Sequence, residues 1–175
     1  MENQALMEKA TRFHGHICPG LTIGVLAAKY VLEHGFNYSP NEEIVAVVEN
    51  DNCSIDALQA LLGTTYGKGN LIHHDYGKLN YYFYNRETEK AVKLSMKPRA
   101  FGNKKLTRNE RIKLLLDSKP EDIFTIYEIE FDPPGLAQIE ESVPCEICGE
   151  PTMNSRLMFY ESRNICIPCY KTQRE

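Results

Sequence analysis

Residues 44–62 read Ile-Val-Ala-Val-Val-Glu-Asn-Asp-Asn-Cys-Ser-Ile-Asp-Ala-Leu-Gln-Ala-Leu-Leu, and this stretch decides the fold class of the chain. The run Ile44–Val48 is apolar and mostly β-branched, which is typical of a buried strand. It ends in the polar turn 49–53, and a helical stretch follows through Leu62. The stretch therefore predicts a strand, a polar turn and a helix.

Further elements are predicted on both sides of this stretch. Hydrophobic periodicity, β-branched and aromatic runs and a capping box decide their types. They are, in order, helices over 3–13 and 21–33, a loop over 63–77, two hairpin strands over 79–84 and 91–96, a helix opened by Thr107–Glu110 and bounded by Pro120, and a strand over 124–131. This order predicts an α+β fold with a mixed or antiparallel sheet flanked by helices.

Length and composition are those of a globular chain. The protein has 175 residues, of which 42% are hydrophobic and 25% are charged. No apolar run has the length of a signal sequence, and none approaches the roughly 20 residues of a membrane-spanning helix. We therefore expect a cytoplasmic protein that is not embedded in a membrane.

A break in regular structure divides the chain. The segment Asp-Pro-Pro-Gly at 132–135 disfavours both helix and strand, and Glu140 and Glu141 follow it. We predict an α+β domain over 1–132, a linker over 133–143 and a small C-terminal module over 144–175.

Four of the six cysteines lie in this module as two Cys-x-x-Cys pairs, Cys145/Cys148 and Cys166/Cys169, with seventeen residues between the pairs. In a reducing compartment this spacing indicates a metal site and not disulfides. Four thiolates satisfy the tetrahedral preference of zinc and leave no position for a substrate, which predicts a structural zinc. A rubredoxin-like iron site and a redox dithiol are the alternatives.

A second group of metal-ligating residues lies near the N-terminus. His14, His16 and Cys18 alternate, so an extended backbone places all three on one side. Pro19 suits the first position of a helix, which makes Cys18 its N-cap, and Cys53 also precedes a helix; both positions favour the thiolate. These residues predict a site for zinc or another transition metal. The alternative is that they are packing residues.

Other residues near these turns carry possible chemistry. His14 or Asp51 could transfer protons, and Cys53 could take part in catalysis as well as in metal binding. Lys68 lies between Gly67 and Gly69, where it could contact an anionic cofactor, although Gly-x-Gly alone is weak evidence. Glu49 and Asp51 could instead orient a histidine ligand.

Charge is distributed unevenly along the chain. Residues 86–119 contain eleven Lys or Arg and four acidic residues, a local charge of +7, so the remaining residues carry −11 and the whole chain −4. The overall balance does not favour nucleic-acid binding. The basic segment could meet an anionic ligand or an acidic partner, or it could be a solvated helix and hairpin.

Three segments stand out beside the cysteine pairs: Phe-His-Gly-His-Ile-Cys-Pro-Gly over 13–20, Asp-Asn-Cys-Ser-Ile-Asp-Ala-Leu-Gln over 51–59 and Gly-Thr-Thr-Tyr-Gly-Lys-Gly-Asn-Leu over 63–71. Together they resemble the FmdE family, named after the E subunit of formylmethanofuran dehydrogenase. The resemblance implies a thioredoxin-like body followed by a treble-clef or ribbon-like zinc finger. It also implies a body metal site at His16, Cys18 and Cys53, with His14 close by, and an association with the molybdenum or tungsten enzyme of methane-forming archaea.

Two functional hypotheses follow. In the first, the protein is a metal-binding accessory protein of anaerobic one-carbon or molybdenum/tungsten redox metabolism, whose C-terminal module docks a larger redox enzyme or a second copy. In the second, it is a stand-alone zinc-dependent enzyme with an open His/Cys metal position. A plain interaction domain is a third interpretation. The aromatic strand 79–84 could form a homodimer, although an internal core explains it equally well.

Overall fold

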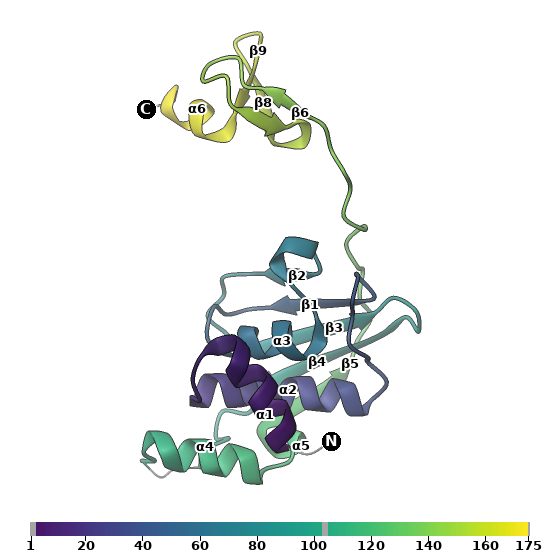
Figure 1. Ribbon diagram of the computed structural model, residues 1–175, viewed down its shortest axis with the longest axis vertical. Helices are drawn as coiled ribbons and strands as arrows, with labels where there is room; N and C mark the ends of the chain where they lie inside the picture. Colours follow the sequence, from purple (N-terminus) through teal and green to yellow (C-terminus); the bar gives the residue numbers. More distant parts are fainter. Residues whose placement is uncertain (1–2, 103–104, 175) are drawn as a thin grey trace. The chain divides into compact units, whose positions relative to one another are not determined.

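The computed structural model describes residues 3–102 and 105–174, and the chain divides into two compact units (Figure 1). We call residues 1–136 the body and residues 137–175 the tail. Each unit has its own buried cluster and is described by itself.

The body combines five α-helices, a short 3-10 helix and five strands within its described residues. In chain order these are α1 (Asn3–His14), α2 (Pro19–Glu33), β1 (Ile44–Val48), α3 (Ser54–Leu62), η1 (Tyr66–Lys68), β2 (Leu71–His73), β3 (Asn80–Asn85), β4 (Lys90–Met96), α4 (Arg108–Asp117), α5 (Pro120–Ile123) and β5 (Phe124–Glu128).

The five strands form one mixed sheet in the order β2-β1-β3-β4-β5. The β1–β2 pair is parallel and the other pairs are antiparallel. Strand β1 lies next to the edge strand, and all five of its residues are buried. The unbroken apolar run of β1 is therefore explained by burial on both faces.

Helices α1, α2 and α3 cover one face of the sheet (Figure 1). Side chains alternate between the faces of each strand, so Ala46 and Val48 pack with the helices, whereas Val45 belongs to a separate small cluster on the other face. That second cluster contains Tyr84 and Ala91, and Phe131 stacks on Tyr84 with 5.5 Å between ring centroids.

The contact between α2 and α3 depends on Gly24. A Cβ atom at this position would lie 2.1 Å from the carbonyl oxygen of Ser54, which is the first residue of α3. Only a residue without a side chain lets the two helix backbones approach this closely. The approach brings the start of α3 beside α2.

A hydrogen-bonded network holds the β1–α3 turn. The Tyr81 hydroxyl donates to Ser54 Oγ at 2.8 Å, and Asn52 Oδ1 accepts from the Ser54 backbone N–H at 2.9 Å. Burial raises the pKa of Tyr81 to about 12, so this hydroxyl stays protonated and remains a donor at physiological pH.

The tail consists of two small hairpins and a short helix. Its elements are β6 (Ser142–Pro144), β7 (Pro151–Met153), η2 (Asn154–Arg156), β8 (Leu157–Tyr160), β9 (Arg163–Cys166) and α6 (Ile167–Thr172). Within residues 137–174, its buried cluster consists of Cys145, Ile165 and Cys166. Such a core is too small to fold a unit of this size without a cross-link or a metal.

The α+β class, the mixed sheet and the C-terminal cysteine module are confirmed, as is the capping box of Thr107 and Glu110. The prediction of a loop over 63–77 was wrong at β2, a three-residue strand in a Gly- and His-rich segment. The last predicted strand ends at Glu128 and not at residue 131. The thioredoxin-like arrangement stays a prediction.

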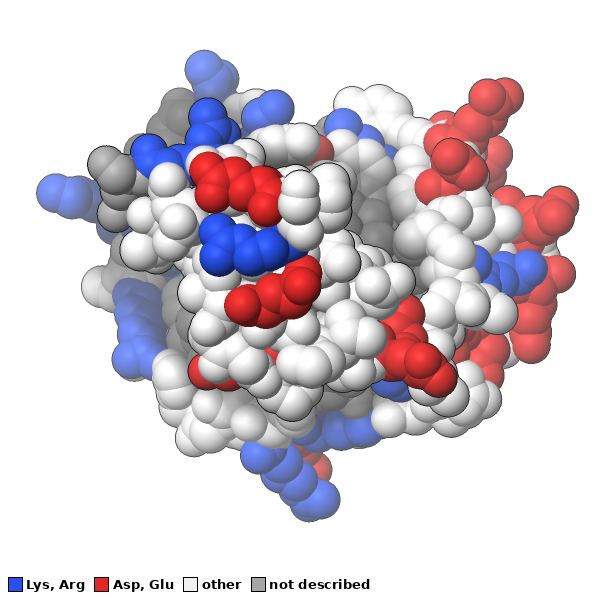
Figure 2. Space-filling view, turned by 90° about the horizontal axis from the view of Figure 1, so that it is seen from above, with Lys and Arg blue, Asp and Glu red and all other residues white. Residues whose placement is uncertain are grey.

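Neither unit offers a membrane span: within the described ranges, every helix is too short or too polar to cross a bilayer. On the face that Figure 2 shows, Lys and Arg side chains occur together with Asp and Glu side chains.

Replacing Gly24 with alanine tests the α2–α3 contact. The added methyl group must push the helices apart, so we expect a loss of about 1–3 kcal/mol in the free energy of unfolding, measured by urea denaturation. Gly67→Ala is the matched control, because a Cβ there meets no atom within 4 Å. Equal stability of the two variants would contradict this account of the contact.

Candidate metal centres

The first candidate centre lies in the body, where α1 ends and α2 begins. Gly15 stops α1 because it adopts a φ of +93°, and its N–H bonds the carbonyl oxygen of Thr11 at 2.7 Å. Cys18 is the N-cap of α2, with Pro19 following it, as predicted from the sequence. The short connection leaves His14, His16 and Cys18 side by side.

The ligand atoms of His14, His16 and Cys18 all lie within 4.8 Å of one another. The ring centroids of His14 and His16 are 4.5 Å apart, and His14 Nε2 lies 3.8 Å from Cys18 Sγ. Two imidazoles and a thiol are a donor set that suits zinc and other late transition metals. The three residues therefore fit a metal site on their chemistry and on their spacing.

Asp56 orients His14 for this role. Its Oδ2 atom lies 2.7 Å from His14 Nδ1, and the His14 side chain is only 11% exposed. A carboxylate accepts a hydrogen bond, so Nδ1 of the neutral imidazole carries the proton and the Nε2 lone pair points away from Asp56. Metal-bound histidines in proteins are commonly held by a carboxylate in this way.

Cys18 and Cys53 lie together but differ in environment. Cys18 Sγ accepts a hydrogen bond from the Leu21 backbone N–H at 3.4 Å, whereas the Cys53 side chain makes no capping bond at the start of α3. Burial raises the pKa of the Cys53 thiol, and the neighbouring Cys18 side chain raises it further. Both effects act against the thiolate that the helix start was expected to favour at Cys53, and the role of this residue stays a prediction.

Gly20 makes room for Cys53. A Cβ atom at Gly20 would lie 3.2 Å from the Cys53 Cβ, so any larger residue there would press on the cysteine. The Pro-Gly pair after Cys18 thus has two physical roles. Pro19 begins α2, and Gly20 leaves space for Cys53 in the β1–α3 turn.

The other predicted site residues lie outside this group. Asp51 is exposed. Lys68 Nζ donates to the carbonyl oxygens of Ser39 and Pro40 at 2.8 and 3.2 Å, which ties η1 to the segment before β1. Glu49 accepts hydrogen bonds from Asn80 and Tyr82. The roles given to these residues in catalysis and cofactor binding stay predictions.

Sequence reasoning missed Asp56 as a partner of His14. A signal for it was present, since Asp56 follows Cys53 by three residues and the start of a helix places such residues on the same side. The pairing partner is 42 positions away in the sequence, however, and only the packing of α1 against α3 brings it close.

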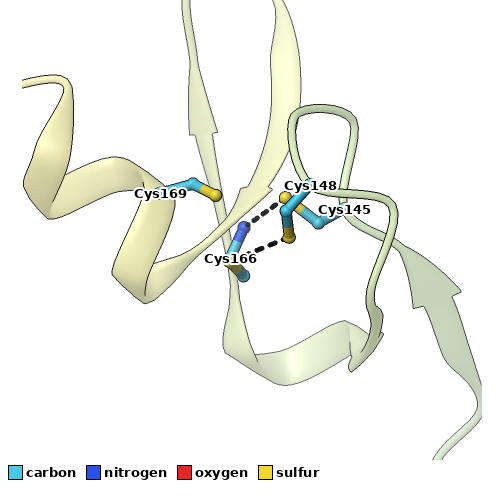
Figure 3. A group of neighbouring side chains, drawn as sticks. All are labelled: Cys145, Cys148, Cys166 and Cys169. Atoms are coloured by element: carbon cyan, nitrogen blue, oxygen red, sulfur yellow. Dashed lines mark hydrogen bonds between the residues drawn. The ribbon is translucent and has the colours of Figure 1, made fainter.

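The second candidate centre is the cysteine cluster of the tail. Cys145, Cys148, Cys166 and Cys169 offer four sulfurs within 4.8 Å of one another (Figure 3). Cys145 Sγ accepts a hydrogen bond from the Cys166 backbone N–H at 3.2 Å, and the sulfurs of Cys148 and Cys166 are 3.8 Å apart. Each knuckle thus turns its two sulfurs toward the other knuckle.

The pKa values of the tail cysteines are shifted in opposite directions. Hydrogen bonds from the backbone N–H groups of Cys148 and Cys166 lower the pKa of Cys145 to about 6. The neighbouring Cys166 thiol and burial raise the pKa of Cys169 to about 12, because four crowded sulfurs cannot all be thiolates without a cation. A divalent ion removes this conflict, and a complete set of four sulfurs fits zinc.

Two family models match the chain. The model described as "FmdE, Molybdenum formylmethanofuran dehydrogenase operon" matches residues 13–128, and the model described as "Prokaryotic dksA/traR C4-type zinc finger" matches residues 138–173. The first match contains every body residue of the candidate centre, and the second contains all four tail cysteines.

Two similar proteins are informative. A crystal structure of an FmdE-like protein of tungsten formylmethanofuran dehydrogenase type from Syntrophus aciditrophicus has a TM-score of 0.73 and 22% identity, and the match covers 99% of this chain and 94% of that one. A probable S-adenosyl-L-methionine-binding protein from Archaeoglobus fulgidus is 29% identical over 94% of this chain. The match spans 52% of that relative, about half its length.

Asp56→Asn tests the orientation of His14. We expect the body centre to bind Co²⁺ or Zn²⁺ between about ten and a hundred times more weakly, because an amide holds the imidazole less firmly and makes it less basic. Competition with a chromophoric chelator measures this, with the tail site filled first. Asp75→Asn changes the same charge on the exposed β2–β3 connection and should leave the affinity unchanged. Equal affinities in both variants would mean that Asp56 has no such role.

Metal removal tests the tail centre. We expect treatment of the intact chain with a strong chelator to unfold residues 142–172 while the body stays folded, because the tail has little core of its own and the body has a large one. Backbone NMR spectra would show collapse of tail resonances and preservation of those from β1 and α2. Retention of the tail resonances would contradict a folding role for the metal.

Proposed function

Because the chain belongs to the FmdE family, we propose that it is a metal-binding accessory protein whose body holds a transition metal through His14, His16 and Cys18. The observation that carries this proposal is the convergence of three ligand atoms within 4.8 Å, one of them anchored by Asp56. We also propose Cys53, a neighbour of Cys18, as a further sulfur ligand, although it is not one of the three residues whose ligand atoms converge. When bound, such a metal supplies a Lewis acid.

The metabolic setting of the proposal is anaerobic one-carbon or molybdenum/tungsten redox chemistry. Support comes from the description of the family model and from the name of the Syntrophus aciditrophicus protein, both of which contain formylmethanofuran dehydrogenase. In this setting the tail holds a structural zinc and docks a larger redox enzyme or a second copy of the chain. A four-sulfur centre leaves no open position, which suits a docking module better than a catalyst.

We also propose a homodimer, formed through strand β3 of the body and not through the tail. Strand β3 places Tyr81 and Phe83 in the core beneath the helices, whereas Tyr82 and Tyr84 lie on the helix-free face. Phe131 stacks on Tyr84, so part of that face is covered within the chain. Sedimentation equilibrium decides whether the uncovered part joins two copies.

A stand-alone zinc-dependent enzyme is the second candidate. The favouring observation is that the three-residue group, unlike the tail cluster, leaves a fourth position open and includes the exposed His16. In this alternative the body residues hold the metal and Asp51 or His14 handles protons, although the bond of His14 to Asp56 suits a ligand better than an acid. The absorption spectrum of the Co²⁺ form separates the cases, because a shell completed by Cys53 leaves no room for substrate.

Metal stoichiometry tests the accessory-protein proposal. We expect two metals per chain in the wild type, one after His14→Ala and Cys18→Ser are combined, and one after Cys148→Ser and Cys166→Ser are combined, because the two centres share no ligand. Elemental analysis of protein purified without added metal measures this.

The Cys53→Ser variant tests whether Cys53 is a ligand of the body metal. Loss of the body metal in this variant makes Cys53 a ligand, and retention with weaker binding makes it a neighbour. Wild-type protein with one metal, lost only with the tail cysteines, would contradict the body site.

A further inference from the structure

A cavity of about 710 Å³ lies between α1 and α4. Its walls are largely apolar and include Met7, Ile17, Ile112 and Leu116. Binding sites for small organic molecules have volumes of roughly 300–1,000 Å³ and apolar linings with a few polar groups. This cavity therefore has the size and character of a ligand site, and none of the metal centres uses it.

The cavity adjoins the body centre. Thr11 lines it and precedes His14 by about one turn of α1, and Ile17 lines it between His16 and Cys18. Arg108, the first residue of α4, donates a hydrogen bond to the Ile17 carbonyl oxygen at 2.7 Å. The loop that carries the metal ligands is thus part of the cavity wall.

Two polar groups of the lining lack partners. Thr11 Oγ1 is buried and has no hydrogen-bond partner among the residues that the structure describes. Arg12 is exposed, and within the same residues it has no ion-pair partner, although Glu8 supplies a carboxylate elsewhere in the lining. The Thr11 hydroxyl is enclosed by protein atoms, so Arg12 is the polar group of the two that is open to a ligand.

Basic side chains lie at the cavity and beside it. The cavity itself is lined by Arg12 and Glu8. A neighbouring cavity of about 540 Å³ shares Ile17, Ile112 and Leu116 with the first and is lined by Arg108 and Lys113 against Asp117. Helix α4 belongs to the basic segment 86–119, and the helix itself carries three basic and two acidic residues, a net charge of +1. This segment is the feature of the sequence that neither metal centre explains.

We propose that the α1–α4 cavity binds an amphiphilic organic anion. Its apolar body lies against Met7, Ile112 and Leu116, and its carboxylate, sulfonate or phosphate group meets Arg12. Binding of this anion goes beyond the proposed function and requires no metal. A role for the anion as the molecule presented to the body metal rests on the proposed function.

Two fluorescent probes of similar apolar shape test this site on the full chain. The first is 8-anilinonaphthalene-1-sulfonate, which is anionic, and the second is N-phenyl-1-naphthylamine, which is neutral. We expect Arg12→Gln to weaken binding of the anionic probe by about tenfold, since a charge-assisted contact is lost, and to leave the neutral probe unaffected. Ile112→Gln should weaken binding of both probes.

Lys9→Gln is the matched control. Lys9 is an exposed cation on the same helix, but its ammonium lies over the Tyr38 ring, 4.6 Å from the centroid, and does not line the cavity. Both probes should bind this variant as they bind the wild type. Equal affinity of the anionic probe for the wild type and Arg12→Gln, or binding of both probes unchanged by Ile112→Gln, would overturn the proposal. Far-UV circular dichroism checks that each variant is folded.

Displacement identifies the source of the anion. Release of the anionic probe by decanoate indicates a free organic acid, release only by phosphatidylglycerol vesicles indicates a lipid, and release by neither counts against the proposal. Repeating the probe titration after the metals have been chelated separates the cavity proposal from the proposal of a body metal. Probe binding that persists in protein without a body metal supports the cavity even if the metal proposal fails.

Discussion

The body centre depends on one close contact between helix backbones. At Gly24 the backbone of α2 approaches the carbonyl oxygen of Ser54, leaving no space for a Cβ atom. Because Ser54 begins α3, this contact fixes the position of the whole β1–α3 turn relative to the start of α2. Cys53 then meets Cys18, and Asp56 reaches His14. Residues from two distant segments thus form one group because a glycine lets two helices touch.

The two metal centres have opposite relations to folding. The body has a continuous core beneath its sheet, so its fold needs no metal, and its ligands are held by hydrogen bonds and helix ends. Among the residues that the structure describes, the tail has three buried ones, two of which are cysteines of the four-sulfur cluster. In the tail the binding energy of the metal is folding energy. A metal in the body would instead bind to a fold that its own core already supports.

The sequence predicted most elements of the fold because burial leaves a local signature. The apolar run of β1 and the capping box of Thr107 appear in the chain itself. It did not predict β2, whose three residues pair only with a strand already formed, or the bond between His14 and Asp56, which depends on helix packing. The spacing of His14, His16 and Cys18 indicated a site, and the resemblance to the FmdE family pointed to His16, Cys18 and Cys53 with His14 close by. In the structure the ligand atoms of His14, His16 and Cys18 converge, and the bond of His14 to Asp56 is the part that spacing did not indicate.

The same helix, α1, serves the centre and the neighbouring cavity. Its C-terminal turn presents His14 to the ligand group, while Thr11 and Arg12, within one turn before it, line the space beside α4. Arg108 links α4 to the Ile17 carbonyl oxygen, so the loop between His16 and Cys18 contacts α4 as well as joining α1 to α2. A ligand in the cavity and a metal held by His14, His16 and Cys18 would therefore contact the same short loop.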